Sequence, residues 1–220
     1  MGDEKLAEFI GILLGDGNLG IYKSRADGKV KTQYRIKITL DSLTDREYCL
    51  HVVRLIEGIF GKKPVVWKRK DARAVDLFIF GENYLQSLLR LGMALAPKWD
   101  RATIPMAFTK HRYGRLVVRG YMDTDGCICV VNNNGIRYPR IEMKICPSPM
   151  QEQFIGILIQ NGFKPQISKL EKGKVRVTLA GIGNLKRWNE LIGFSNERNQ
   201  KVANSFLGET TTQHYKAHGR

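Results

Sequence analysis

The chain has no long apolar run. Nowhere in its 220 residues do about 18 apolar side chains follow one another, the length that a membrane-spanning helix needs. The first residues, Met1-Gly2-Asp3-Glu4-Lys5, also lack the basic start of a signal peptide. We therefore expect an intracellular protein, in the cytoplasm of a prokaryote or in an organelle, and not a secreted or membrane protein.

Cysteine and histidine are scarce too, with four of each. Four cysteines are too few for a disulfide framework. Cys127 and Cys129 are separated by a single residue, whereas a zinc knuckle has two or more between its ligands. We expect the cysteines to be reduced, and neither residue type predicts a metal site by its spacing.

Acidic residues are outnumbered, 21 Asp and Glu against 36 Lys and Arg, which gives a formal net charge of +15. A content of 43% hydrophobic and 26% charged residues is typical of a folded protein, so the charge does not indicate disorder. So much positive charge on a compact body favours a polyanionic partner. Nucleic acid is the leading candidate and a membrane surface is the weaker alternative.

The predicted secondary structure occurs twice along the chain. Residues 34–40 alternate strictly, which predicts a strand with Arg35, Lys37 and Thr39 on one face and apolar residues on the other, after a basic loop. The first half also predicts helices at 6–14, 45–60 and 84–91 and strands at 65–70 and 74–80. The helix at 45–60 is expected to bury Leu50, Val53, Ile56 and Phe60. The second half repeats this order at 116–122, 140–145, 150–160, 165–170, 175–180 and 184–192.

The offset between the two halves changes slowly along the chain, as a divergent tandem duplication would leave it. Asp16 and Asp125 are 109 residues apart, and Lys37 and Lys144 are 107 apart. Pro64 and Pro165 are 101 apart, Leu85 and Leu185 are 100 apart, and Gly92 and Gly193 are 101 apart. The length of the chain is therefore best interpreted as two similar halves.

Each half contains the same short pattern, at residues 9–17 and 118–126. Small residues stand four apart on a helix, Gly11 with Gly15 and Gly120 with Thr124, and an Asp-Gly pair follows at once. Such residues form a flat strip through which two helix backbones can approach closely. If the helices pack through these strips, their ends bring Asp16 and Asp125 side by side.

Two neighbouring carboxylates at the negative ends of helix dipoles resist ionisation unless a cation is present. Magnesium binds through one or two carboxylates and takes its remaining ligands from water and substrate phosphates. Metals held in this way activate water and stabilise the leaving oxygen of a phosphodiester. Together with the basic strand faces, this chemistry indicates hydrolysis of a nucleic-acid backbone. An ordinary Asp-Gly turn explains either segment alone, but not both in register.

The two segments resemble the LAGLIDADG motif, and the whole chain resembles the monomeric homing endonucleases that carry two such motifs. The resemblance implies an α+β fold of two pseudo-symmetric αββαββα halves, with the motif helices packed at the centre and antiparallel sheets forming a DNA-binding saddle. We expect the first half at 1–108, a linker at 109–114, the second half at 115–207 and a polar tail at 208–220.

The resemblance further implies a monomer that binds a long site in double-stranded DNA and cuts it across the minor groove, leaving 3′ overhangs. Asp16 and Asp125 would bind two or more Mg²⁺ ions, helped by the carbonyls of Gly15 and Thr124. Asp123 has Leu14 at the matching place and is not expected to be an essential ligand. Lys98 and Arg198 would lie near the scissile phosphates. Where the family often has water-organising side chains, this chain has Leu40-Asp41 and Pro147-Ser148, which leaves Lys37 and Lys144 as substitutes.

The expected DNA contacts are polar or charged side chains on outward strand positions and hairpin turns. Arg and Lys can recognise guanine and Glu can recognise cytosine, so the set can supply specificity as well as charge. In the first half these residues are Lys23, Arg25, Lys29, Lys31, Arg35, Lys37, Thr39, Lys68, Lys70 and Arg73. In the second half they are Arg137, Arg140, Glu142, Lys144, Lys172, Lys174, Arg176 and Thr178.

Three alternatives remain open at the level of sequence. An RNA maturase that assists intron splicing and a DNA-binding regulator that has lost cleavage would share the fold and the charge. A basic RNA-binding scaffold would explain the charge but not the paired motifs.

Overall fold

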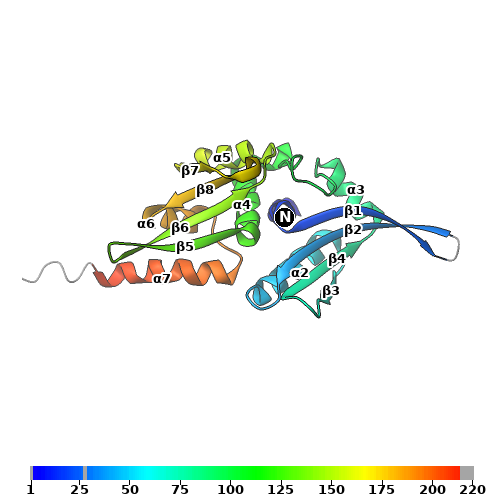
Figure 1. Ribbon diagram of the computed structural model, residues 1–220, viewed down its shortest axis with the longest axis horizontal. Helices are drawn as coiled ribbons and strands as arrows, with labels where there is room; N and C mark the ends of the chain where they lie inside the picture. The colour runs from blue at the N-terminus through cyan, green and yellow to red at the C-terminus, as the bar shows by residue number, and fades with distance from the viewer. Residues whose placement is uncertain (1, 27–28, 214–220) are drawn as a thin grey trace, which may run out of the picture.

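The computed structural model describes residues 2–26 and 29–213, which form two similar units (Figure 1). The first unit contains α1 (Gly2–Leu14), β1 (Gly17–Ala26), β2 (Lys29–Asp41), α2 (Arg46–Phe60), β3 (Val65–Lys68), β4 (Ala74–Phe80) and α3 (Glu82–Arg90). A connection with the short helix η1 (Met106–Phe108) leads to the second unit. This contains α4 (His111–Asp125), β5 (Gly126–Asn133), β6 (Ile136–Ile145), α5 (Met150–Gln160), β7 (Gln166–Lys169), η2 (Glu171–Gly173), β8 (Val175–Ala180), α6 (Ile182–Leu191) and α7 (Glu197–Gln213).

Each unit has a four-stranded antiparallel sheet, in the order β1-β2-β4-β3 in the first and β5-β6-β8-β7 in the second. α1 and α4 lie side by side where the two units meet (Figure 1). This arrangement confirms the predicted α+β fold of two repeated halves. Within residues 2–26 and 29–213, no helix is long and apolar enough to cross a membrane.

The alternating pattern of β2 positions one face of the first sheet against the core. Ile36, Ile38 and Leu40 are buried. They pair with Ile79, Leu77 and Val75 of β4, which are buried as well. Directly paired residues of antiparallel strands share a face, so Arg35, Lys37 and Thr39 lie on the opposite side of the sheet. We call this side, and its counterpart in the second unit, the outer sheet face.

Two details of the first half differ from the sequence prediction. The basic segment predicted as a loop is mostly a long hairpin, because Gly17 to Ala26 pairs with Ile38 to Lys29 along its whole length. The stripe predicted for α2 is partly wrong. Leu50 is 51% exposed, whereas Tyr48, Val52, Leu55 and Ile56 are buried. These positions follow the spacing i, i+4, i+7, i+8 of a helix face that packs on a sheet.

The strand register corrects one of the sequence offsets. Gly17 pairs with Ile38 in the first sheet, and Gly126 pairs with Met143 in the second. Ile38 is therefore equivalent to Met143, and Lys37 is equivalent to Glu142 and not to Lys144. The difference arises because the hairpin of the first half is longer than that of the second.

The helix boundaries also bear on the expected domain limits. α4 begins at His111, inside the segment expected as a linker, and α7 continues to Gln213, inside the expected tail. Residues 214–220 of that tail lie outside the described part of the chain.

Candidate functional site

Small residues allow α1 and α4 to pack backbone to backbone. A Cβ atom on Gly11 would overlap the carbonyl oxygen of Val117, and one on Gly120 would overlap the carbonyl oxygen of Glu8. A Cβ on Gly15 would overlap the Thr124 hydroxyl, which donates to the carbonyls of its own helix instead. The two helix ends therefore meet at Gly15 and Thr124, and each is followed directly by an aspartate.

Asp16 and Asp125 share one electrostatic environment at this meeting point. Burial and the charge of Asp125 raise the pKa of Asp16 to about 7. Asp125 keeps some contact with solvent, but partial burial of its carboxylate raises its pKa, against the opposing charges of Lys98 and Lys174. The main causes of both shifts are burial and neighbouring charges. The pair therefore has excess negative potential and free acceptor oxygens, which suits a hard cation.

Lys98 lies in the connection between the halves and binds the end of α1. Its Nζ donates to three carbonyl oxygens, of Leu13 at 2.5 Å, Gly15 at 2.7 Å and Gly17 at 2.9 Å. Burial lowers the pKa of Lys98 to about 8, although Asp125 and Asp16 oppose the shift. Three carbonyls at a helix C-terminus satisfy all three donors of an ammonium group. Lys98 thus fixes the turn before Asp16, and its ammonium already occupies the Gly15 carbonyl.

Arg198 has a different environment from Lys98, despite the matching position in the repeat. Its Nη1 lies 3.4 Å from Asp45 Oδ1, and its positive charge lowers the pKa of Asp16. Both basic residues therefore act on Asp16, but only Lys98 is held by the backbone of a motif helix.

No family model and no curated protein matches the sequence. Solved structures do match it over nearly their whole lengths. Meganuclease I-SmaMI bound to uncleaveable DNA is 9% identical, with a TM-score of 0.65 over 94% of this chain and 90% of that one. The I-LtrWI LAGLIDADG homing endonuclease bound to target DNA is 8% identical, with a TM-score of 0.66 over 99% and 94%. I-DmoI in complex with DNA and Mn is 15% identical, with a TM-score of 0.60 over 89% and 99%.

The chain has the LAGLIDADG homing endonuclease fold. The resemblance drawn from the two short motifs is thereby confirmed at the level of the fold, since the matches cover both halves. The two segments that resemble the motif, residues 9–17 and 118–126, lie at the ends of α1 and α4, where they carry Asp16 and Asp125.

The third acidic residue of the motif region, Asp123, faces away from the LAGLIDADG aspartate pair. It is fully buried and accepts hydrogen bonds from the Ser195 backbone N–H at 2.6 Å and from Asn199 Nδ2 at 3.0 Å. Burial raises the pKa of Asp123 to about 6. Asp123 thus anchors the start of α7 to α4.

A buried ionic cluster behind the motif helices was not predicted from the sequence. Glu8 of α1 accepts from Arg119 of α4 at 2.5 Å and from the Ser195 hydroxyl at 2.6 Å, and His51 Nε2 of α2 lies 2.9 Å from it. The cluster joins four segments from both halves. One signal was present in the sequence, because Glu8 is the single charged residue in the apolar run 6–14.

The expected DNA-contact residues fall on both sides of the sheets. The strand register places Lys29, Lys31, Arg35, Lys37, Thr39, Arg140, Glu142, Lys144, Arg176 and Thr178 on the outer faces. It places Lys23, Arg25, Lys68 and Arg137 on the opposite side. The remaining four, Lys70, Arg73, Lys172 and Lys174, lie in or beside the turns.

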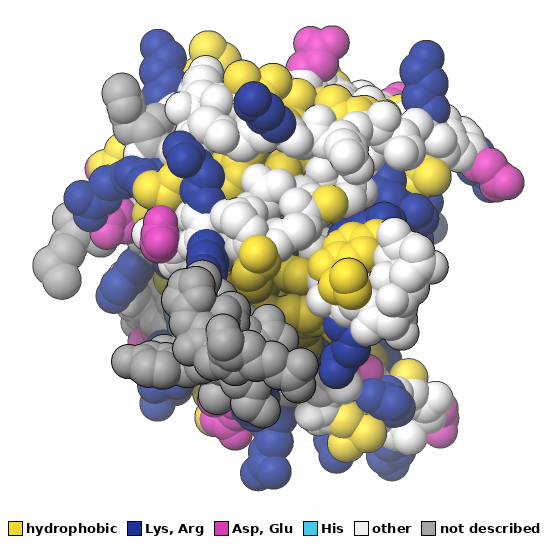
Figure 2. Space-filling model, turned by 90° about the vertical axis from the view of Figure 1, so that its left-hand side faces the viewer, with side chains coloured by type: hydrophobic (Ala, Val, Ile, Leu, Met, Phe, Trp, Pro, Cys, Tyr) yellow, Lys and Arg dark blue, Asp and Glu magenta, His cyan; other side chains and the backbone are white. Residues whose placement is uncertain are grey.

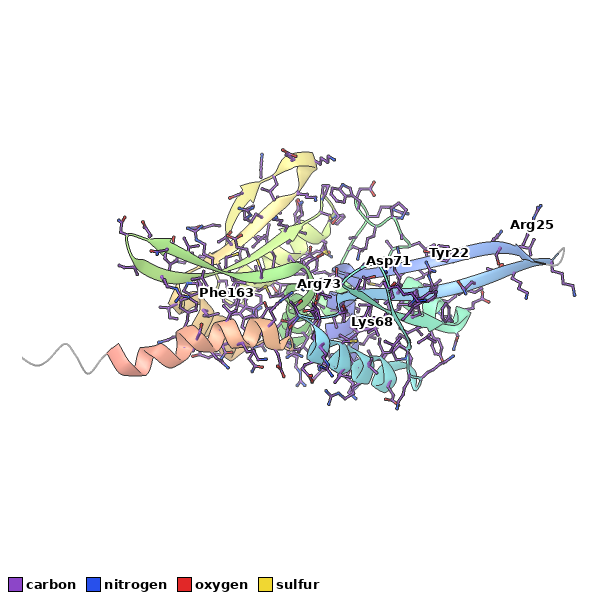
Figure 3. The ribbon with its side chains drawn as sticks, turned by 60° about the horizontal axis from the view of Figure 1, so that its bottom comes forward. Tyr22, Arg25, Lys68, Asp71, Arg73 and Phe163 are labelled. Carbon is purple, nitrogen blue, oxygen red and sulfur yellow. The ribbon has the colours of Figure 1, made fainter. Side chains whose placement is uncertain are left out.

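The placement of Arg25 is visible in Figure 3, and that of Lys174 follows from a contact. Tyr22 and Arg25 lie along the long β1–β2 hairpin, which extends away from the rest of the molecule (Figure 3). Lys174 lies beside the site, with its Nζ 4.7 Å from the centre of the Trp99 ring. Lys and Arg side chains are also scattered around the edge of the end of the molecule formed by the second half, so the charge is not confined to the outer faces (Figure 2).

Proposed function

We propose that this protein is a metal-dependent endonuclease that cuts a specific site in double-stranded DNA. The observation that carries the proposal is the aspartate pair, where two crossing helices bring one carboxylate from each half to the same place. The basic outer faces flank this pair on both sides, as binding of one duplex by both halves requires. The solved structures that share the fold include DNA complexes with manganese and with calcium.

The aspartate pair fits a divalent metal. Within residues 2–26 and 29–213 there is no group of three or more His, Cys, Asp and Glu able to hold one, so Asp16 and Asp125 would supply the protein ligands and water and phosphate the rest. Bound there, a magnesium ion would make water a stronger nucleophile and stabilise the leaving oxygen. The Thr124 carbonyl remains a candidate ligand, and the Gly15 carbonyl would have to be shared with Lys98.

The residues of this chain would then divide the work of hydrolysis. Water adds to the phosphorus atom, the bond from phosphorus to the leaving oxygen breaks, and in the net reaction the proton that water loses is matched by the proton that the leaving oxygen gains. Asp16 and Asp125 would hold the metal ion, and Lys98 keeps the turn before Asp16 in place. Arg198 and Lys174 would add positive charge near the phosphate. As the resemblance implies, the proposed cut is staggered across the minor groove and leaves 3′ overhangs.

The test is Asp16→Asn, compared with the wild type on a randomised duplex library from which cleaved molecules are selected. With magnesium we expect cleavage by the wild type and none by the variant, while the affinity for the cleaved site changes less than about threefold, because amide and carboxylate are alike in size. Asp100→Asn makes the same chemical change at an exposed position and should cleave normally. Equal cleavage by Asp16→Asn, or DNA binding by the wild type without cleavage, would contradict the proposal.

A further inference from the structure

The two outer sheet faces differ in chemistry at equivalent positions. Strand pairing makes Trp67 equivalent to Ser168, Phe78 to Thr178 and Phe80 to Ala180. The aromatic residues of the first half contact one another, with ring centres 6.4 Å apart for Trp67 and Phe78 and 5.7 Å apart for Phe78 and Phe80. The first half therefore has a group of three aromatic residues at outer-face positions where the second half has Ser168, Thr178 and Ala180.

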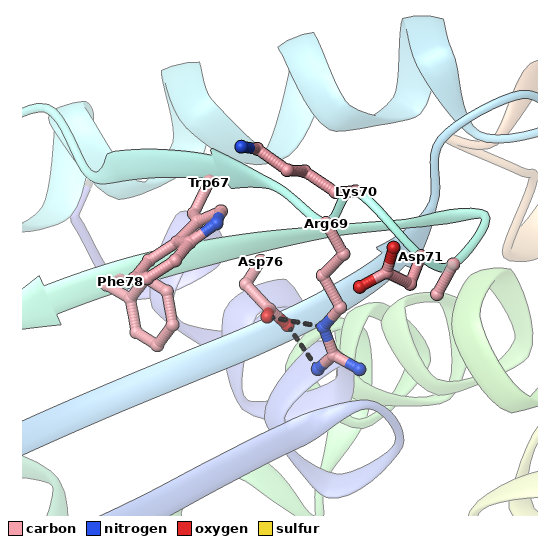
Figure 4. Close-up of a pocket in the computed structure, with 7 residues that line it drawn as sticks. Trp67, Arg69, Lys70, Asp71, Asp76 and Phe78 are labelled. Carbon is pink, nitrogen blue, oxygen red and sulfur yellow. Dashed lines mark hydrogen bonds and ion pairs between the residues drawn. The ribbon is translucent and has the colours of Figure 1, made fainter.

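This surface forms one wall of an open pocket of about 580 Å³ (Figure 4). Trp67 is 64% exposed and stands on the same outer face as Arg35 and Lys37. Exposing so much of an indole ring to water is unfavourable, because apolar area left in water forgoes about 25 cal/mol per Å² of burial. A ligand with an apolar group would be favoured in this pocket.

The opposite wall of the pocket supplies hydrogen-bond donors. Arg69 donates from Nε to Asp76 Oδ2 at 2.8 Å and from Nη2 to Asp76 Oδ1 at 3.0 Å (Figure 4). Asp76 also accepts from the Thr39 hydroxyl at 2.6 Å, and this set of contacts fixes the guanidinium group. A guanidinium has five N–H groups, so three remain for a ligand.

We infer that the Trp67–Arg69 pocket recognises thymine in the half-site bound by the first half of the chain. In the major groove, thymine presents a methyl group beside the O4 acceptor, which matches an aromatic wall beside an arginine donor. Guanine offers acceptors without a methyl group, and cytosine presents a donor that faces the arginine unfavourably. The inference rests on the proposed binding of DNA and adds which base is read, by which residues and in which half-site.

The experiment begins with selection of bound duplexes from a randomised library, by the wild type and by Trp67→Ser. The variant introduces the residue that the second half has at the equivalent position, and the exposure of Trp67 makes misfolding no concern. We expect a thymine preference at one position of one half-site to be lost in Trp67→Ser. Ser168→Ala, at the equivalent exposed position, should leave that preference unchanged.

The second step replaces that thymine by uracil in the selected duplex, which removes only the methyl group. The dissociation constant of the wild type should rise about fourfold, as expected for one buried methyl group, and that of Trp67→Ser less than twofold. Specific binding without a thymine position that depends on Trp67, or with equal uracil effects in both proteins, would overturn this inference and leave the proposed function intact. Selection of no specific site would overturn both.

Discussion

Replacing Glu8 by Gln should test whether the buried cluster holds the two halves together. Burial alone would raise the pKa of Glu8, but the hydrogen bond to His51 and the charge of Arg119 outweigh it and bring the pKa to about 2, from an ordinary 4.5. At about 1.4 kcal/mol per pKa unit, this shift corresponds to about 3 kcal/mol of stability at neutral pH. Gln keeps the size of the side chain but leaves Arg119 without its partner, a change that costs about 3–5 kcal/mol in buried pairs.

The measurement is urea unfolding of Glu8→Gln and the wild type between pH 3 and pH 7. Because the pKa of Glu8 is lower in the folded state, its contribution is complete above pH 4.5 and is lost as the pH falls toward 2. The difference between the two proteins should therefore be about 3 kcal/mol at pH 7 and shrink below pH 4.5.

Glu197→Gln is the control for this prediction. Glu197 pairs with Lys201 at 2.8 Å on the surface of α7, where both side chains are exposed. An exposed pair of this kind contributes at most about 0.5 kcal/mol. If Glu8→Gln cost no more than Glu197→Gln, or if its cost did not depend on pH, the argument that the cluster stabilises the fold would be refuted.

Three further outcomes are expected. Gly120→Ala should lower the unfolding free energy by about 3 kcal/mol or more, because the added Cβ would overlap the Glu8 carbonyl. Gly156→Ala on α5, where the added Cβ has nothing within 4 Å, should raise the unfolding free energy by about 0.5–1 kcal/mol. Equal effects of the two changes in thermal unfolding would contradict the tight helix contact. Magnesium binding at pH 7 should release protons, because the raised pKa of Asp16 leaves its carboxyl group partly protonated. Calorimetry in buffers of different ionisation enthalpy measures this proton release, which should disappear in Asp16→Asn. DNA affinity should fall steeply with salt in a filter-binding assay, and a flat response would indicate that the +15 charge does not contact phosphates.

The local features of this fold could be predicted because they follow from patterns along the chain. Alternation identified the outer face of β2, and the paired small residues with Asp16 and Asp125 identified the motif helices. Leu50 was assigned to the wrong face because the predicted stripe began with two successive spacings of three, whereas the buried residues Tyr48, Val52 and Leu55 begin with a spacing of four. The offset between Lys37 and Lys144 was wrong because the sequence alone does not show that the β1–β2 hairpin is longer than the β5–β6 hairpin.

The parts that could not be predicted depend on contacts between distant segments. The sequence placed Lys98 near the phosphates, but its three bonds to α1 carbonyls arise only when the connection folds back on the helix end. The partners of Glu8 lie 43, 111 and 187 residues away. The aromatic surface at Trp67 escaped notice because each ring alone is compatible with a core position.

The Glu8–Arg119 contact makes the union of the two halves selective for unlike partners. At the repeat offset of the motif helices, Val117 is the counterpart of Glu8 and Ile10 is the counterpart of Arg119. Two first halves packed together would set Glu8 against Ile10 and leave it His51 in place of Arg119, and two second halves would set Arg119 against Val117 with no carboxylate at the Glu8 position. The contact therefore favours pairing of one first half with one second half over pairing of two identical halves.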